Sequence, residues 1–404
     1  MHIFHIPTGF PSRHNAVSGI SAKDLIDAFS KHYPETINIV SLFHETTFYL
    51  VLKGNNFLKE LVRYFRKKDG IQIIWANKNL ALCYAPKSLI YSNKLGYNVK
   101  EHWLKQHREN LKYIIKTQGK PDIIHGQFTH YGGWVAWMLS KEFSIPCIIT
   151  ERFGPFPPPG SIVNERLSDD FLIPMKEVAA LVSVSQSHAI DIKKYVNRDI
   201  QVIHNLIDEE LFIPKKKNMQ EDGFQFATIT SSYQPNKGIK DLLIAISIIK
   251  KRGINAQFLI GGGGTDHYYK GLKKLTKELD IEDRVQWVDK LTRREVASVM
   301  QKCNCFISSS IYESFGLVCT EAIACGIPVI ATRSGGPEDI INITNGLLVD
   351  KNNPVMLAEA IEKMLNSIGN YNPEEIRQDF INRFSRKAIV EKYFQLYSNI
   401  INKK

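Results

Sequence analysis

Residues 305–341 read CFISSSIYESFGLVCTEAIACGIPVIATRSGGPEDII, and the rest of the chain is organised around them. The stretch begins with a short apolar run that ends in three serines. An acidic, glycine-containing turn follows at 313–316, and the pattern then predicts a short helix from Leu317. The first half of this stretch is therefore typical of a buried strand that turns into a helix.

The second half of the stretch repeats this arrangement. Gly326 followed by Pro328 is typical of a helix end, and residues 327–332 then fit a buried strand. A second tight turn comes at 334–337, where Pro337 suits the first position of another helix. We therefore expect two strand-to-helix turns that lie side by side.

If the two strands are parallel neighbours, their helix N-termini and unpaired backbone N–H groups face one crevice at the carboxyl ends of the strands. Each helix end stabilises a solvated anion by about 0.3–1 kcal/mol, so phosphate is a natural ligand. Glu313 and Glu321 flank this site and would repel a bare anion. A nucleoside diphosphate sugar resolves the conflict, because it has hydroxyls at both ends and diphosphate between them. The alternative is that one glutamate is a helix-start charge and the other is merely solvated.

With seven residues between Glu313 and Glu321, the segment SSSIYESFGLVCTEAIACGIPVIAT resembles the signature of family-four retaining glycosyltransferases of the GT-B fold, glycosyl transferases group 1. The resemblance implies an α/β protein with two Rossmann-like domains, whose parallel sheets face each other across a cleft. It predicts an N-terminal acceptor-side domain at 1–213 and a C-terminal nucleotide-sugar-binding domain at 214–385. The last segment, 386–404, is expected to form a helix that crosses back onto the first domain.

The resemblance also implies site roles. Glu313 would orient the hydroxyls of the donor sugar and Glu321 would bind the ribose. Lys237, which precedes a glycine as in the family, would contact the donor diphosphate. The donor-binding backbone would be that of Phe315, Gly316, Leu317 and Val318. No metal or other cofactor is expected, because the lysine and the helix ends would neutralise the leaving group.

The chain departs from the family pattern at two positions. Ser232 stands in the donor site where relatives commonly have an arginine, so Lys237 must contribute more, with Arg333 or Arg152 as candidate helpers. Arg152 also stands near the position where many relatives carry a histidine that faces the donor sugar. It could bind a phosphate or an acidic acceptor, or pair with a neighbouring carboxylate.

Three further candidates come from the first domain. Gly19, in the first strand-to-helix loop, is expected to let the donor diphosphate approach the backbone, although it could be an ordinary turn glycine. His125 ends a predicted strand, and single histidines of this kind are more often structural than catalytic. His125 and Asn15, together with Arg152, are candidates for contacts with the acceptor or with phosphate.

The composition excludes several classes. At 404 residues and 44% hydrophobic content, the chain fits two or three globular domains. Its longest apolar runs are too short to span a bilayer, and the start shows no signal-peptide pattern, so we expect a cytoplasmic protein. The six cysteines form no C-x-x-C motif and are predicted to be reduced core residues; metal binding by Cys303 and Cys305 is the less favoured alternative.

The net charge of +11 is concentrated in the first half, where residues 1–200 carry 25 Lys and Arg against 17 Asp and Glu. Residues 57–68 fit a basic amphipathic helix, which could contact an anionic membrane at the inner face of the cytoplasmic membrane. A core-facing helix with a solvated basic side is the favoured alternative. Nucleic acid is not an expected partner, because the chain has no aromatic-basic recognition motif and no zinc spacing.

The sequence therefore predicts a retaining glycosyltransferase of the hexosyltransferase class. Its partners would be a nucleotide-sugar donor and a glycan or lipid-linked acceptor, as in lipopolysaccharide, capsule or other cell-surface polysaccharide biosynthesis. Two alternatives stay open: another enzyme of the same fold, such as an epimerase or a glucan synthase or phosphorylase, and a non-catalytic sugar-binding protein. The sequence does not identify the base, the sugar or the acceptor.

Overall fold

The computed structural model describes residues 1–11, 18–43, 48–49, 65, 69–87, 89–90, 98–214, 223–263 and 267–403. Three sequence-based predictions lie outside them. These are Asn15, the basic helix 57–68 apart from the exposed Phe65, and most of the segment 214–223, whose polar sequence between two strand patterns predicts the hinge between the domains. Across the described residues, no helix is both long enough and apolar enough to cross a bilayer.

The N-terminal half is built on an eight-stranded sheet that is parallel except at one edge, where β4 runs antiparallel to β5. The sheet order is β12 (Gln201–Val202), β11 (Ala180–Ser183), β8 (Cys147–Glu151), β7 (Ile123–Gln127), β1 (His2–Pro7), β2 (Ile37–Leu42), β5 (Leu80–Tyr84) and β4 (Gln72–Trp75). Its helices are α1 (Ile20–His32), α3 (Val99–Gln118), the π-helix η2 (Thr129–Gly133), α4 (Trp134–Phe143), α5 (Asp169–Glu177) and α6 (Gln186–Lys193). Two small pairs complete it: β3 (Phe48–Tyr49) with β6 (Leu89–Ile90), and β9 (Ile162–Val163) with β10 (Arg166–Leu167).

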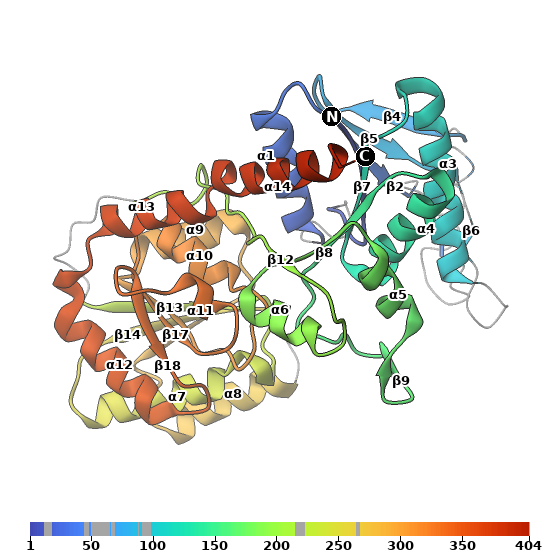
Figure 1. The fold of residues 1–404 in the computed structure, drawn as a ribbon. Helices are drawn as coiled ribbons and strands as arrows, with labels where there is room; N and C mark the ends of the chain where they lie inside the picture. The colour runs from blue at the N-terminus through green and yellow to red at the C-terminus, as the bar shows by residue number, and fades with distance from the viewer. Residues whose placement is uncertain are drawn as a thin grey trace.

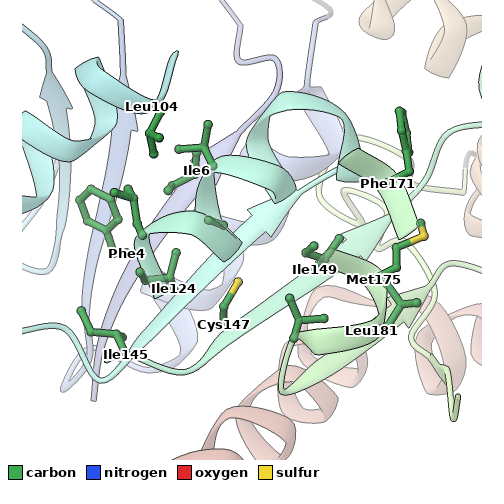
Figure 2. Close-up of a cluster of buried hydrophobic side chains, with 14 of the residues drawn as sticks. Phe4, Ile6, Leu104, Ile124, Ile145, Cys147, Ile149, Phe171, Met175 and Leu181 are labelled. Carbon is green, nitrogen blue, oxygen red and sulfur yellow. The ribbon is translucent and has the colours of Figure 1, made fainter. Parts of the chain in front are cut away.

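The central strands of this sheet are buried on both faces, which explains their nearly continuous apolar sequences. Every residue of β1, β7 and β8 is buried. Figure 2 shows part of the core on one face, where Phe4 and Ile6 of β1 and Ile124 of β7 pack with Leu104 of α3. The covered sheet therefore leaves only its strand ends and loops available for ligand binding.

The C-terminal half contains a fully parallel six-stranded sheet. Its order is β15 (Val285–Val288), β14 (Gln257–Gly261), β13 (Gln225–Ile229), β16 (Cys305–Ser308), β17 (Val329–Thr332) and β18 (Gly346–Val349). Its helices are η3 (Pro235–Lys237), α7 (Ile239–Lys251), α8 (His267–Glu278), α9 (Arg293–Lys302), α10 (Leu317–Ala324), α11 (Pro337–Ile340), α12 (Pro354–Ser367), η4 (Ile368–Asn370) and α13 (Pro373–Phe384).

The last helix, α14 (Arg386–Ile401), leaves the second lobe and packs against α1 of the first, as Figure 1 shows. Tyr393 and Tyr397 on this helix are buried against the first sheet, with Ile3 and Phe29 in the same cluster. The prediction of two Rossmann-like domains with a helix that crosses back is confirmed. The predicted division at residues 213 and 214 falls in the connection between β12 and β13.

The predicted strand at 327–332 corresponds to β17 (Val329–Thr332), and the helix predicted from Leu317 is α10. The sequence analysis did not predict β5 or the long helix α3. All six cysteines are buried free thiols, as their apolar surroundings predicted.

Candidate active site between the two sheets

The two strand-to-helix turns predicted from residues 305–341 lie side by side. β16 and β17 are parallel neighbours, and the turns that follow them are bonded to each other. The N–H of Glu313 donates to the carbonyl oxygen of Ser334 at 2.8 Å, and the N–H of Gly336 donates to the carbonyl oxygen of Glu313 at 2.8 Å. A Cβ at Gly336 would lie 2.1 Å from the Phe315 carbonyl oxygen, so only glycine allows the turns to pack this closely.

A cavity of about 280 Å³ opens between the two sheets beside these turns. Both halves of the chain contribute to its wall. The first half supplies Ser21, Phe128, Arg152 and Asn205, and the second half supplies Thr228–Ser231, Lys237, Ile307–Ser310 and Glu313–Val318. A polar interdomain cavity of this kind is a common place for a ligand site in α/β proteins.

Lys237 and Glu313 form an ion pair in this cavity. Lys237 Nζ lies 2.7 Å from Glu313 Oε1, and the two side chains keep only 18% and 17% of their surface exposed. The Ser310 hydroxyl donates to the same Glu313 oxygen at 2.8 Å. Within the described part of the chain, no hydrogen bond ends on Glu313 Oε2, which leaves that oxygen available to accept from a hydroxyl.

The loop that carries Lys237 is fixed to the β16 turn. Gly238 adopts the left-handed conformation with φ 62°, and a Cβ there would lie 1.9 Å from the Ser309 carbonyl oxygen. The Ser309 hydroxyl donates to the Lys237 carbonyl oxygen at 3.1 Å, and the Ile311 N–H donates to the Asn236 carbonyl oxygen at 2.7 Å. The glycine after Lys237 therefore matches the sequence motif and is also required sterically, because a side chain there would collide with the β16 turn.

Helix α10 begins at the wall of the cavity. Its N-cap, Gly316, has φ 105° and no side chain that could satisfy the first N–H groups. The residues from Phe315 to Val318 line the cavity, and the described hydrogen bonds of the main chain do not use the N–H groups of Leu317 and Val318. These N–H groups and the positive end of the helix face the cavity beside Lys237, an arrangement that suits an anionic group.

Glu321 lies one turn further along α10, outside the cavity lining, with 9% of its surface exposed. Burial raises the pKa of the Glu321 carboxyl to about 7, and nearby Arg293 opposes this rise. Arg293 Nη1 also bonds to Asp24 Oδ2 at 2.9 Å, which links α9 of one half to α1 of the other. This interdomain pair gave no signal in the sequence.

The remaining predicted site residues fall in different places. Arg152 lines the cavity. Gly19 caps α1 with φ 65° and lies outside the lining, although Ser21 is part of it. Ser232 is half-buried and accepts a bond at its carbonyl oxygen, whereas its neighbour Ser231 lines the cavity.

His125 is fully buried below α14, away from the cavity lining. Its Nδ1 lies 2.7 Å from the Tyr397 hydroxyl and its Nε2 lies 2.8 Å from the Thr150 hydroxyl. Burial lowers the pKa of this imidazole well below its usual value, so it stays neutral. This placement favours the structural alternative for His125. Arg333, which pairs with Asp350 at 3.7 Å, also lies outside the lining.

Comparison with known proteins agrees with this architecture. The model of glycosyl transferases group 1 matches residues 211–384, and that of glycosyltransferase family 4 matches residues 54–211. An uncharacterized glycosyltransferase of Methanocaldococcus jannaschii is 29% identical over 300 residues, which cover 72% of this chain and 78% of that protein. Several other curated relatives are matched over only 55% to 66% of their own length.

Solved structures show the same fold. Sucrose-phosphate synthase from Thermosynechococcus elongatus superposes with a TM-score of 0.73 at 20% identity and full coverage of both chains. Anabaena HepE, solved in complex with UDP, gives a TM-score of 0.68 at 17% identity, with 99% of this chain and all of that chain covered. The fold is that of a GT-B glycosyltransferase. The chain belongs to glycosyltransferase family 4, and it is an enzyme of the transferase class.

Proposed function

We propose that this protein is a retaining glycosyltransferase that moves a sugar from a nucleoside diphosphate sugar to a hydroxyl acceptor. One observation carries the proposal. A lysine, a carboxylate and the open N-terminus of α10 meet in a single cavity between the domains. The lysine and the helix N-terminus suit a diphosphate, and the carboxylate suits the hydroxyls of a sugar.

In this proposal, Lys237 and the N–H groups from Phe315 to Val318 neutralise the diphosphate as it leaves. Preorganised donors of this kind typically lower a barrier by about 2.7–4 kcal/mol each. Glu313 accepts hydrogen bonds from the donor sugar through the oxygen that Lys237 does not hold. Glu321 accepts a hydrogen bond from the ribose. Because burial raises the pKa of this carboxyl to about 7, its charge, and with it the strength of that hydrogen bond, depends on pH in the neutral range.

The proposal needs no metal, because the charge of the leaving group is met by the lysine and the helix end. It also needs no protein base. If the acceptor attacks from the side of the leaving group, a phosphate oxygen of the donor takes the acceptor proton and the anomeric configuration is retained.

The donor class has support from the solved relatives, since HepE has been crystallised with UDP and with UDP-glucose. For the acceptor we propose a lipid-linked or cell-surface glycan, made at the inner face of the cytoplasmic membrane. The excess of basic residues in the first half of the chain supports this choice, because basic surfaces are attracted to anionic membranes.

A screen of UDP-, GDP- and ADP-sugars by thermal shift tests the proposal. A ligand that binds only the folded state at 100 times its Kd adds about 2.7 kcal/mol of stability, so the correct donor should raise the melting temperature. NMR of the product then gives the anomeric configuration. A protein that responds to none of these donors, or that inverts the configuration, would contradict the proposal.

A further inference from the structure

Arg152 is a buried cation on the wall of the cavity, and the side chains that hold it are neutral. Only 8% of its surface is exposed. Its Nε donates to the Asn205 amide oxygen at 2.9 Å, and its Nη1 donates to the Gln127 amide oxygen. The phenol of Tyr393 also interacts with it, and burial raises the pKa of that phenol, which keeps it uncharged.

The adjacent carboxylate of Glu151 interacts with this guanidinium through space, but within the described residues it forms no hydrogen bond or ion pair with it. Glu151 Oε2 accepts from the Thr129 N–H at 2.9 Å. Its Oε1 accepts from the main-chain N–H groups of Arg152 and Phe153 at 2.9 and 2.8 Å. Within the described residues, Arg152 takes part in no ion pair. The other cation of the cavity, Lys237, is already paired with Glu313.

A buried charge normally has a charged partner, because its desolvation costs several kcal/mol. Arg152 has amide and phenol partners instead, and it lies where a ligand would bind. Because Glu151 acts on the guanidinium only through space, a hydrogen-bonded counter-ion is expected on the ligand. A guanidinium is particularly suited to a carboxylate, which it can hold with two parallel hydrogen bonds.

The position of Arg152 along the cavity determines which end of the ligand it contacts. A Cβ at Gly154, two residues further on, would lie 2.6 Å from the Tyr312 ring and 2.9 Å from Ser314 Cβ. These two residues flank Glu313. Glu321, by contrast, lies beside Arg293 and Asp24. The strand end that carries Arg152 therefore lies beside the Glu313 turn, and both residues line the cavity at the end that our proposed function assigns to the sugar.

We propose that Arg152 binds a carboxylate at the sugar end of the cavity, so that one of the two sugars joined there is an acidic sugar. The inference rests on the proposed function and deepens it. The carboxylate could belong to the donor, as a nucleoside diphosphate hexuronate, or to the acceptor. Arg152 is then a specificity-determining residue for the transfer reaction.

The donor source is tested by calorimetric titration of the wild-type protein with donors that differ only at C6: UDP-glucose with UDP-glucuronate, UDP-galactose with UDP-galacturonate, and GDP-mannose with GDP-mannuronate. If the donor is acidic, the uronate of one pair should bind at least tenfold more tightly than its neutral partner. Arg152→Gln should reduce this preference to threefold or less. Arg198→Gln is the control, because Arg198 is partly buried and, among the described residues, donates to the carbonyl oxygens of Met175, Lys176 and Val178, outside the cavity lining.

The acceptor source is tested by titrating D-glucuronate and D-glucose into the protein saturated with UDP or GDP. Tighter binding of glucuronate that is lost in Arg152→Gln would support an acidic acceptor. The inference is overturned if neither titration favours the acid, a result that needs only the wild-type protein. It is also overturned if Arg152→Gln weakens UDP and every UDP-sugar equally, since the guanidinium would then serve the diphosphate. Failure of all nucleotides to bind would instead overturn the proposed function itself.

Discussion

Replacing Lys237 by methionine should separate the catalytic role of the Lys237–Glu313 pair from its structural role. The substitution keeps most of the side-chain volume and removes the charge that lies 2.7 Å from Glu313 Oε1. Two effects are expected, one on turnover and one on stability. They have different sizes and respond differently to a second substitution.

The loss of turnover follows from the leaving group. One missing donor at a developing negative charge costs about 2.7–4 kcal/mol, which corresponds to a decrease in kcat of roughly 100- to 1000-fold. Ser232, at the position where the family resemblance leads us to expect an arginine, is neutral, so no second cation from that position reduces the loss.

The loss of stability follows from the unpaired carboxylate. Removal of one partner from a fully buried ion pair costs about 3–5 kcal/mol. Because Glu313 keeps 17% exposure and a bond from Ser310, we expect about 2–3 kcal/mol, or a decrease in melting temperature of roughly 4–12 °C for a domain of this size.

The double variant Lys237→Met/Glu313→Gln distinguishes the two effects. It leaves no buried unpaired charge, so the melting temperature should recover by at least half of the loss. Turnover should stay as low as in either single variant, because the groups that hold the diphosphate and the sugar are both altered. Lys351→Met is the control, since Lys351 donates to the nearby Ile311 carbonyl oxygen at 3.2 Å but does not line the cavity.

The assay is release of the nucleotide from whichever donor the thermal-shift screen identifies, which requires no known acceptor. Melting is followed by differential scanning fluorimetry on the same preparations. Turnover of Lys237→Met within threefold of the wild type, or full recovery of turnover in the double variant, would refute the assignment of Lys237 to the leaving group.

Three further predictions concern the surroundings of this pair. Gly238→Ala should lower both melting temperature and turnover, because its Cβ would meet the Ser309 carbonyl oxygen at 1.9 Å. Gly271→Ala is the control and should not lower the melting temperature, because the space around Gly271 is open. Equal melting temperatures of the two variants would contradict the steric argument. The pKa of Glu321 is raised from 4.5 to about 7 by burial, so the folded state loses stability as the pH rises between these values. Glu321→Gln should therefore melt at a higher temperature than the wild type at pH 8, with a smaller difference at pH 5. A difference in melting temperature that does not depend on pH would contradict this prediction. Arg293→Met should raise the pKa of Glu321 further, because Arg293 lowers the pKa of that carboxyl, so the pH-dependent change in melting temperature should move above pH 7. A move of this change to lower pH would contradict the prediction.

The parts of the fold that the sequence predicted correctly depend on local signals. Gly316, Gly326 and Pro337 set the turns around α10 and α11 through backbone conformations that few other residues adopt as readily. Strand β5 was missed because the short sequence LALCY resembles any apolar run, and nothing in it specifies insertion between β2 and β4. Local composition indicates that a strand forms, but its neighbours are chosen by packing across the whole sheet.

The candidate site divides in the same way. The assignment of Lys237 and Glu313 to one site came only from a family resemblance, since 76 residues separate them, and their ion pair was not predicted. The environment of Arg152 could not be predicted even so. Its amide partners are 25 and 53 residues away, and the phenol beside it comes from the last helix of the chain.

This origin of the phenol gives α14 a role beyond holding the two domains together. Tyr393 interacts with Arg152 and lies 3.1 Å from the Thr150 hydroxyl, while Tyr397 bonds to His125. The helix that follows the C-terminal half of the chain thus packs beside the Arg152 cation, which belongs to the N-terminal half. Among the described residues, the side chains that hydrogen-bond to the Arg152 guanidinium are neutral, and Glu151 acts on it only through space. In our proposal the guanidinium is therefore available to a carboxylate of the ligand, and a carboxylate placed on α14 at position 393 would compete with that ligand.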